Sequence, residues 1–325
     1  MPYKRRHLLE KLQVELAAGA ALAVMYLAVG PVLGWWDPEW PTTFVPSGAF
    51  AQMAGFAATV WILAAACALV TVSSRPEGAL LATLVGAAGV SLHSSPIRTI
   101  FWQHEGALGL LFGMLIAEVL LLVVVLLVAE MVVFVVRTGV ARWKPGWMWR
   151  GRVGPSGPSA RAHGDSEPGA GLTLGGGLLR TILARKRLPG ATGGRVGVVS
   201  VSCLGVSVLI GAILLMLLMQ SSHRGQVVFS LFVSFLLAVM IAHQKFPTPF
   251  GAAAWISPIL TAIVFYLLAA GASMETVPNS WTHVPFYARA LPVDWMAAGG
   301  AGAVLGFWIS ERIHELRHME NESTE

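Results

Sequence analysis

The feature that most constrains this chain is one uninterrupted apolar stretch, residues 106–136, which ends at Arg137. It reads GALGLLFGMLIAEVLLLVVVLLVAEMVVFVV, and its only charged side chains are Glu118 and Glu130. At about 1.5 Å per residue, a helix of this length exceeds the roughly 30 Å hydrocarbon core of a bilayer. Inside hydrocarbon every backbone N–H and C=O must be paired within the protein, which a helix achieves by itself. The stretch therefore predicts a transmembrane helix.

Composition extends this prediction to the whole chain. Hydrophobic residues make up 55% of the sequence and charged residues 12%, whereas about a quarter of the residues in a soluble domain are charged. The net charge of +5 does not indicate a nucleic-acid partner, because the basic residues cluster between apolar segments, as topology signals do. Two cysteines, Cys67 and Cys203, both lie inside apolar runs, which excludes a disulfide framework and a cysteine-based zinc site.

Eight apolar segments have a length close to that of a membrane span. They are residues 14–34, 48–72, 77–94, 106–136, 196–219, 225–243, 251–271 and 292–311. If all eight cross with the N-terminus inside, every basic residue except Arg98, Arg224 and Arg289 lies on the cytoplasmic side. The predicted fold is therefore all-α, a polytopic transmembrane helical bundle of about eight spans in the cytoplasmic (inner) membrane, with both termini cytoplasmic.

The segment between the fourth and fifth spans divides the chain into three parts. Residues 1–137 form an N-terminal four-helix half, residues 138–195 a basic Gly/Pro-rich cytoplasmic linker, and residues 196–325 a C-terminal four-helix half with a charged tail. Most of the linker is predicted to be disordered. Its stretch GGLLRTILARKR has leucines on one face and basic residues on the other, which fits an interfacial helix on anionic lipid headgroups. The alternative is a solvated basic linker.

Three further patterns concern helix packing and the membrane boundary. Small residues recur every four positions at Gly78, Ala82 and Gly86, and at Gly302 and Gly306, which predicts close helix contacts. Pro258 lies inside the seventh span, where it should kink the helix and free a carbonyl near Ser257. Tryptophans at the predicted outer boundary fit an interfacial aromatic belt. They are Trp35, Trp36, Trp40, Trp102, Trp281 and Trp295.

Glu118 is the main candidate for function. It lies about four turns into residues 106–136, near the predicted bilayer midplane, with aliphatic residues on both sides. An ionised carboxylate at that depth is costly, so the group should be paired, protonated or directed into a polar cavity. The functional interpretation is a proton or cation relay. The alternative is a neutral carboxylic acid hydrogen-bonded to a neighbouring helix.

The predicted outer loops carry a second constellation, in which each of three arginines has a histidine a few residues away. The candidate ligands are His93, Arg98, His104, His223, Arg224, His283 and Arg289, and the last outer loop adds Asp294. If these loops converge, they could bind an anion, or a metal through the histidines. The alternative is a solvated polar rim.

The C-terminal stretch His314-Glu315-Leu316-Arg317-His318 matches the pattern H-E-x-x-H. On a helix, His314 and His318 share a face and could hold zinc, with Glu315 as the general base. Arg317 beside the second histidine and the short remaining tail count against this site. The alternative is the charged end of a transmembrane helix.

These observations favour a permease-type protein that moves a small solute, with Glu118 near the path. A non-catalytic subunit or scaffold of a larger membrane complex is the alternative, and a zinc hydrolase using HELRH is a distant third. The sequence offers no convincing nucleophile–base set, so we expect no enzyme and no cofactor other than that zinc. The expected partners are the lipid bilayer, anionic headgroups at the linker, and further copies or other membrane proteins.

Overall fold

The computed structural model describes residues 2–33, 43–74, 76–93, 98–104, 106–143, 193–248, 252–273 and 284–324. Within these ranges the chain is helical and contains no β-strand, which confirms the all-α prediction. Most of the predicted linker, including the amphipathic stretch 176–187, lies outside the described residues.

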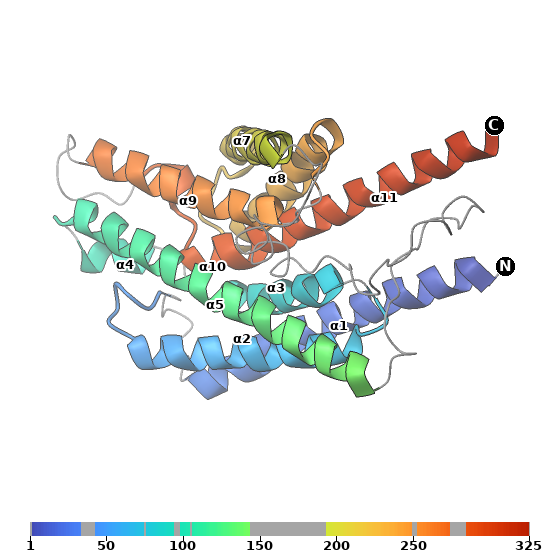
Figure 1. The fold of residues 1–325 in the computed structure, drawn as a ribbon. Coiled ribbons are helices and arrows are strands. Elements are labelled where there is room, and N and C mark those ends of the chain that lie inside the picture. The colour runs from blue at the N-terminus through green and yellow to red at the C-terminus, as the bar shows by residue number, and fades with distance from the viewer. Residues whose placement is uncertain are drawn as a thin grey trace.

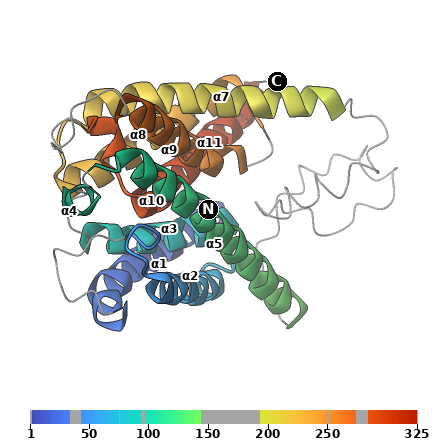
Figure 2. The same cartoon turned by 90° about the vertical axis from the view of Figure 1, so that its left-hand side faces the viewer.

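The N-terminal half consists of α1 (Pro2–Leu33), α2 (Phe50–Val70), α3 (Pro76–His93), the short α4 (Arg98–Gln103) and α5 (Leu108–Trp143). α1 packs along α3, and α5 packs against α2 on one side and against α9 (Ala252–Ser273) of the C-terminal half on the other. Figures 1 and 2 show α1, α2 and α3 as one group, with α5 running obliquely between them and the helices of the second half.

The C-terminal half continues with α7 (Gly193–Leu218), α8 (Arg224–Lys245) and α9, followed by a short 3-10 turn. The chain then forms α10 (Pro292–Asp294), a π-helical turn (Trp295–Gly299) and α11 (Gly300–Thr324), which packs along α8. The N-terminal end of α1 and the C-terminal end of α11 lie at the same end of the bundle (Figure 1).

Five helical stretches of the described residues are long and apolar enough to cross a membrane. They are Phe50–Val70, Leu108–Val140, Val199–Leu218, Arg224–Lys245 and Ala254–Ala272. The third predicted span corresponds to a shorter apolar stretch, Glu77–Leu92. The first predicted span falls on α1, and the last falls on α10, the π-helical turn and α11. Membrane-spanning helices are therefore supported, whereas eight crossings with cytoplasmic termini stay a prediction.

The two small-residue patterns lie at helix contacts, as predicted. A Cβ added to Gly302 or Gly306 of α11 would come within 2.1 or 2.3 Å of a backbone carbonyl oxygen of α8. A Cβ on Gly86 of α3 would lie 2.6 Å from Leu63 and 3.0 Å from Ala21. Since real Cβ atoms do not approach other atoms this closely, glycine is what lets these helix pairs pack at such short separations.

Pro258 lies inside α9, which continues through it, and the predicted kink stays a prediction. Proline has no N–H to donate to the carbonyl four residues earlier, which here belongs to Ala254. The Ser257 hydroxyl donates to that carbonyl instead, at 2.7 Å, and Thr261 Oγ1 donates to the Ser257 carbonyl at 2.9 Å. Gly299 of the π-helical turn packs against this break, where an added Cβ would lie 2.8 Å from the proline ring.

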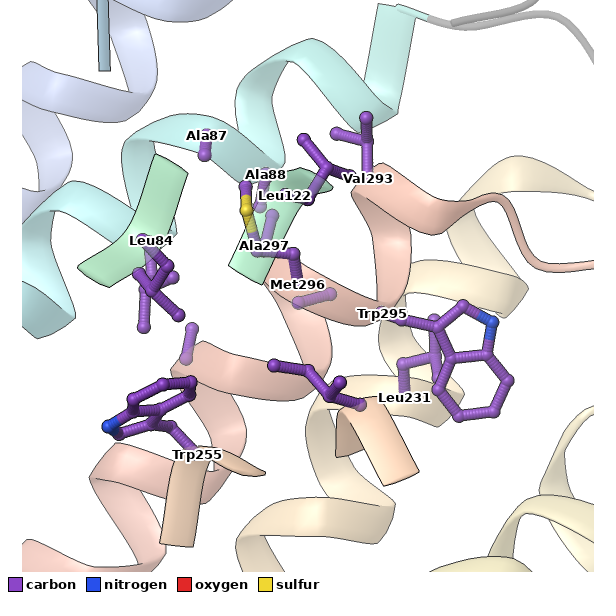
Figure 3. Packing of buried hydrophobic residues seen from close by; sticks show 14 of the residues in the cluster. Leu84, Ala87, Ala88, Leu122, Leu231, Trp255, Val293, Trp295, Met296 and Ala297 are labelled. Atoms are coloured by element: carbon purple, nitrogen blue, oxygen red, sulfur yellow. The ribbon is translucent and has the colours of Figure 1, made fainter. Parts of the chain in front are cut away.

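The centre of the bundle is apolar and formed by both halves. Figure 3 shows Met296 and Ala297 of the π-helical turn packed between α3, α5 and α8. Trp295 is fully buried, 6.2 Å from the Phe235 ring and 5.9 Å from the Phe265 ring between centroids. It therefore does not belong to an interfacial belt, and that assignment from its chain position was wrong. Of the other five tryptophans assigned to the belt, no side chain is among the described residues.

Candidate functional site

Glu118 lies on α5 and is completely buried. Its Oε2 accepts hydrogen bonds from the backbone N–H groups of Phe44 and Val45, at 2.8 and 3.0 Å. Both donors belong to the loop that leads into α2. Oε1 is also buried and has no hydrogen-bond partner within the described residues. The side chain is thus held by a loop backbone rather than by a neighbouring helix, and one of its oxygens is free to bind something else.

The loop that binds Glu118, residues 43–49, is a compact turn, which we call the 43–49 loop. The Ala49 N–H donates to the Phe44 carbonyl at 2.8 Å, and the Gly48 N–H donates to the Val45 carbonyl at 3.1 Å. Gly48 has φ +67°, a left-handed conformation that glycine adopts without steric cost. The Phe44 ring is buried, 5.5 Å from the Phe56 ring of α2. The loop is therefore folded into the bundle.

Contacts between α2 and α5 locate Glu118 along the helix axis. Trp61 donates from Nε1 to the Val125 carbonyl at 3.0 Å, and further along both helices the Arg137 guanidinium donates to the Thr71 carbonyl. Because the residue numbers increase in the same direction along both helices, α2 and α5 run parallel. Glu118 precedes Val125 by seven residues, or about 10 Å of helix. Glu118 therefore lies about one turn inside the start of α2, toward the end of the bundle where the 43–49 loop enters.

Tyr266 and Asp294 are two further buried polar groups of this region. The Tyr266 side chain of α9 is fully buried, donates its hydroxyl to the Ala290 carbonyl at 2.5 Å, and is within electrostatic range of both Glu118 and Asp294. Its ring lies 6.1 Å from that of Phe112 on α5. Tyr266 thus stands between two buried carboxylates from different parts of the chain.

Asp294 forms the strongest polar contact of this region, an ion pair with Arg224 at the start of α8. Nη1 of Arg224 donates to Oδ2 at 2.8 Å and Nη2 donates to Oδ1 at 2.5 Å, while Oδ2 also accepts the Leu291 N–H at 2.7 Å. The guanidinium also donates from Nε and Nη2 to the Ser91 carbonyl of α3, at 3.2 and 2.8 Å. Arg224 therefore links α3, α8 and α10, and four of its five N–H groups donate to protein partners.

The remaining outer-face candidates do not form one ligand site in the described part of the chain. Arg289 donates to the Val284 carbonyl from Nε and Nη2, at 3.2 and 3.0 Å, and burial lowers the pKa of its guanidinium. The His104 Nδ1 lies 3.0 Å from the Ile100 carbonyl, and His223 is exposed. Neither His283 nor the side chains of His93 and Arg98 are among the described residues.

The HELRH stretch lies on α11, beside the end of α8. His314 Nε2 is 3.5 Å from the His243 carbonyl, and the two imidazole centroids are 5.6 Å apart. His243 cannot complete a zinc site, because its Nε2 faces the Thr248 carbonyl at 3.1 Å and its Nδ1 faces the Ser310 hydroxyl at 2.8 Å. Among the described residues no group of three His, Cys, Asp or Glu is placed to hold a metal. The side chains of Glu315 and His318 lie outside the described residues.

His243 and its partners form a buried polar network that the sequence patterns did not indicate. A carbonyl only accepts, so Nε2 of His243 carries the proton and Nδ1 accepts from Ser310. The Gln244 Nε2 donates to Ser310 Oγ at 2.8 Å, which completes the bonding of that hydroxyl. Partners separated by 66 and 67 residues can be found only once the α8–α11 contact is known.

The chain has no match among known protein-family models, curated proteins or solved structures. A functional assignment therefore depends on the geometry of these residues. Glu118 and Glu130 of α5 each keep one buried carboxylate oxygen without a partner among the described residues, and of the two only Glu118 is bonded to a loop. The polar groups of Arg224, Asp294 and His243 instead join helices.

Proposed function

We propose that the protein is a permease-type membrane protein that moves a small solute, with Glu118 as a proton or cation relay beside the path. The observation that carries the proposal is the free, buried Oε1 of Glu118. The negative charge of a carboxylate in hydrocarbon is neutralised by binding a proton or a cation. Ionisable groups within the membrane commonly mark ion or proton pathways.

Two features, one at Glu118 and one on the neighbouring helix α9, support movement. Its other oxygen is bonded to the 43–49 loop rather than to a helix, so a change in its charge acts directly on a connection at the end of the bundle. On the neighbouring α9, Pro258 breaks the helical hydrogen-bond ladder, and Gly299 of a π-helical turn packs on the break. Broken helices and π-helical turns are frequent at functional sites.

The proposed topology is eight crossings in the inner membrane with both termini in the cytoplasm. It is supported by the basic residues of the sequence and by the position of both ends of the chain at one end of the bundle (Figure 1). The basic linker would then lie on the cytoplasmic leaflet, where anionic headgroups attract Lys and Arg.

The test is proton-coupled uptake by the full chain in liposomes that contain a pH-sensitive dye. A panel of organic acids, amino acids, amines and sugars is added outside, and at least one class should drive proton entry. Glu118→Gln should abolish this signal while the protein still inserts, because a carboxamide oxygen can accept the same two N–H bonds but the group cannot exchange a proton.

The matched control is Glu15→Gln, which neutralises an exposed glutamate of α1 paired with Lys11 at 3.6 Å. It should leave uptake unchanged. Uptake that persists in Glu118→Gln would remove Glu118 from the path. A wild-type protein that is inert toward the whole panel, and that leaves its membrane bound to another chain in native mass spectrometry, would instead identify a non-catalytic subunit.

A further inference from the structure

Two buried oxygens at the base of the 43–49 loop lack a hydrogen-bond partner within the described residues. They are Oε1 of Glu118 and Oγ1 of Thr43, and both side chains are at most 1% exposed. We infer that these two oxygens bind one monovalent cation, either a hydronium or a sodium-sized ion, which ties the 43–49 loop to α5. The inference deepens the proposed function and rests on it, because it names the ion that Glu118 would relay.

The backbone places Thr43 and the Glu118 carboxylate next to each other. Thr43 directly precedes Phe44, whose N–H donates to Oε2 of the same carboxylate at 2.8 Å. Consecutive Cα atoms are about 3.8 Å apart, so the Thr43 side chain begins within a few ångströms of the Glu118 carboxylate. The Thr43 carbonyl accepts from the Ser47 hydroxyl at 2.5 Å, which holds this residue in the turn.

The charge of the site favours one positive charge. A buried carboxylate that receives two N–H bonds still carries close to a full negative charge, which is costly in a medium of low polarity. None of the described Lys, Arg or His residues forms an ion pair with Glu118. One bound monovalent cation neutralises the site, whereas a divalent ion would leave an excess charge and would require more oxygen ligands.

Other titratable and charged groups on the surrounding helices do not supply that charge. They are Tyr266 on α9, Asp294 on α10 with its partner Arg224 on α8, Cys67 on α2, Glu77 on α3, and Glu130 and Arg137 on α5. Arg224 is neutralised by Asp294, and Arg137 donates to the Thr71, Val72 and Ser74 carbonyls at the far end of α2. Tyr266, which lies within electrostatic range of Glu118, is not a cation.

The test measures the thermal unfolding midpoint of the purified full chain in sodium chloride and in a bulky organic-cation chloride of equal ionic strength. A ligand that binds only the folded state raises the midpoint with its concentration. Sodium should raise the midpoint at alkaline pH, and acidification should raise it in the absence of sodium. Both effects should disappear in Glu118→Gln and persist in Glu15→Gln.

Thr43→Val removes one ligand oxygen at nearly constant volume and keeps the carboxylate. It should weaken the apparent sodium affinity about tenfold, which corresponds to the free energy of one typical hydrogen bond. This variant decides the question even if Glu118→Gln does not fold. A sodium effect identifies the metal ion, and a pH effect that Thr43→Val weakens, without a sodium effect, identifies the hydronium. A pH effect that Thr43→Val leaves unchanged is ordinary protonation of the carboxyl group and overturns the two-oxygen site.

The inference is overturned if neither sodium nor acid changes the midpoint relative to Glu118→Gln, since the two oxygens would then bind a neutral water only. Its failure is distinguishable from failure of the proposed function. Cation binding without uptake in liposomes refutes the permease. Glu118-dependent uptake that is indifferent to sodium and to Thr43→Val refutes the cation site.

Discussion

The ion pair of Arg224 and Asp294 makes a quantitative prediction about how the bundle is held together. Asp294 is completely buried and the Arg224 side chain is 11% exposed, so neither charge is well solvated by water. The carboxylate accepts two guanidinium bonds and the Leu291 N–H, and the guanidinium also binds the Ser91 carbonyl. Asp294→Asn keeps the shape of the side chain but removes the charge and presents an amide N–H₂ toward the arginine.

The cost of this change follows from the burial of the arginine. Removing one partner of a buried pair leaves an uncompensated charge and typically costs about 3–5 kcal/mol. We expect the lower end, about 3 kcal/mol, because the Ser91 carbonyl still accepts from Arg224 and the arginine retains some exposure. The free energy of unfolding from detergent–denaturant titration in mixed micelles measures this loss.

Two controls separate the pair from a general effect of charge. Glu15→Gln breaks the exposed Lys11–Glu15 pair and should cost no more than about 0.5 kcal/mol. The double variant Arg224→Met/Asp294→Asn removes both charges, so it should cost clearly less than the sum of the two single variants. A loss below about 1 kcal/mol for Asp294→Asn, or strict additivity in the double variant, would refute the view that this pair joins α3, α8 and α10.

Three further predictions concern packing and polar contacts between or within helices, and each is measured as a change in the free energy of unfolding. Gly302→Ala should cost about 1–3 kcal/mol because its Cβ would lie 2.1 Å from the α8 backbone, whereas Gly205→Ala, with nothing within 4 Å, should be neutral or stabilising by up to about 1 kcal/mol. Equal effects at the two glycines would contradict the close α8–α11 contact. Ser257→Ala should cost about 1 kcal/mol by leaving an α9 carbonyl unpaired, and the loss should shrink in a Pro258→Ala background, where a backbone N–H returns. Ser310→Ala should cost about 1–2 kcal/mol because His243 Nδ1 loses its donor and Gln244 keeps only the Ser310 carbonyl, and an unchanged stability would show that this network does not contribute.

Sequence reasoning predicted the features that depend on local order. Apolar length located the helices, four-residue spacing located the glycines of the α1–α3 and α8–α11 contacts, and Pro258 located the break in α9. Each of these follows from the periodicity or backbone chemistry of one segment.

Features that depend on long-range contacts were missed or misassigned. Trp295 was assigned to the interface from its place before an apolar run, but α10 and the π-helical turn carry it into the core. The apolar stretch ends at Arg137, yet α5 continues to Trp143. The Arg137 guanidinium is buried against carbonyls at the end of α2, which the sequence did not indicate. Glu118 was singled out correctly as a buried carboxylate, but its partners on the 43–49 loop are more than 70 residues away.

The most direct test of the central claim is an infrared difference spectrum of the full chain in lipid, recorded between acidic and alkaline conditions. If Glu118 exchanges a proton, the wild-type spectrum contains a carboxyl stretching band that is absent in Glu118→Gln and present in Glu15→Gln, and sodium reduces it. Identical spectra for wild type and Glu118→Gln would show that this carboxyl group does not change its charge, and the proposed relay would be wrong.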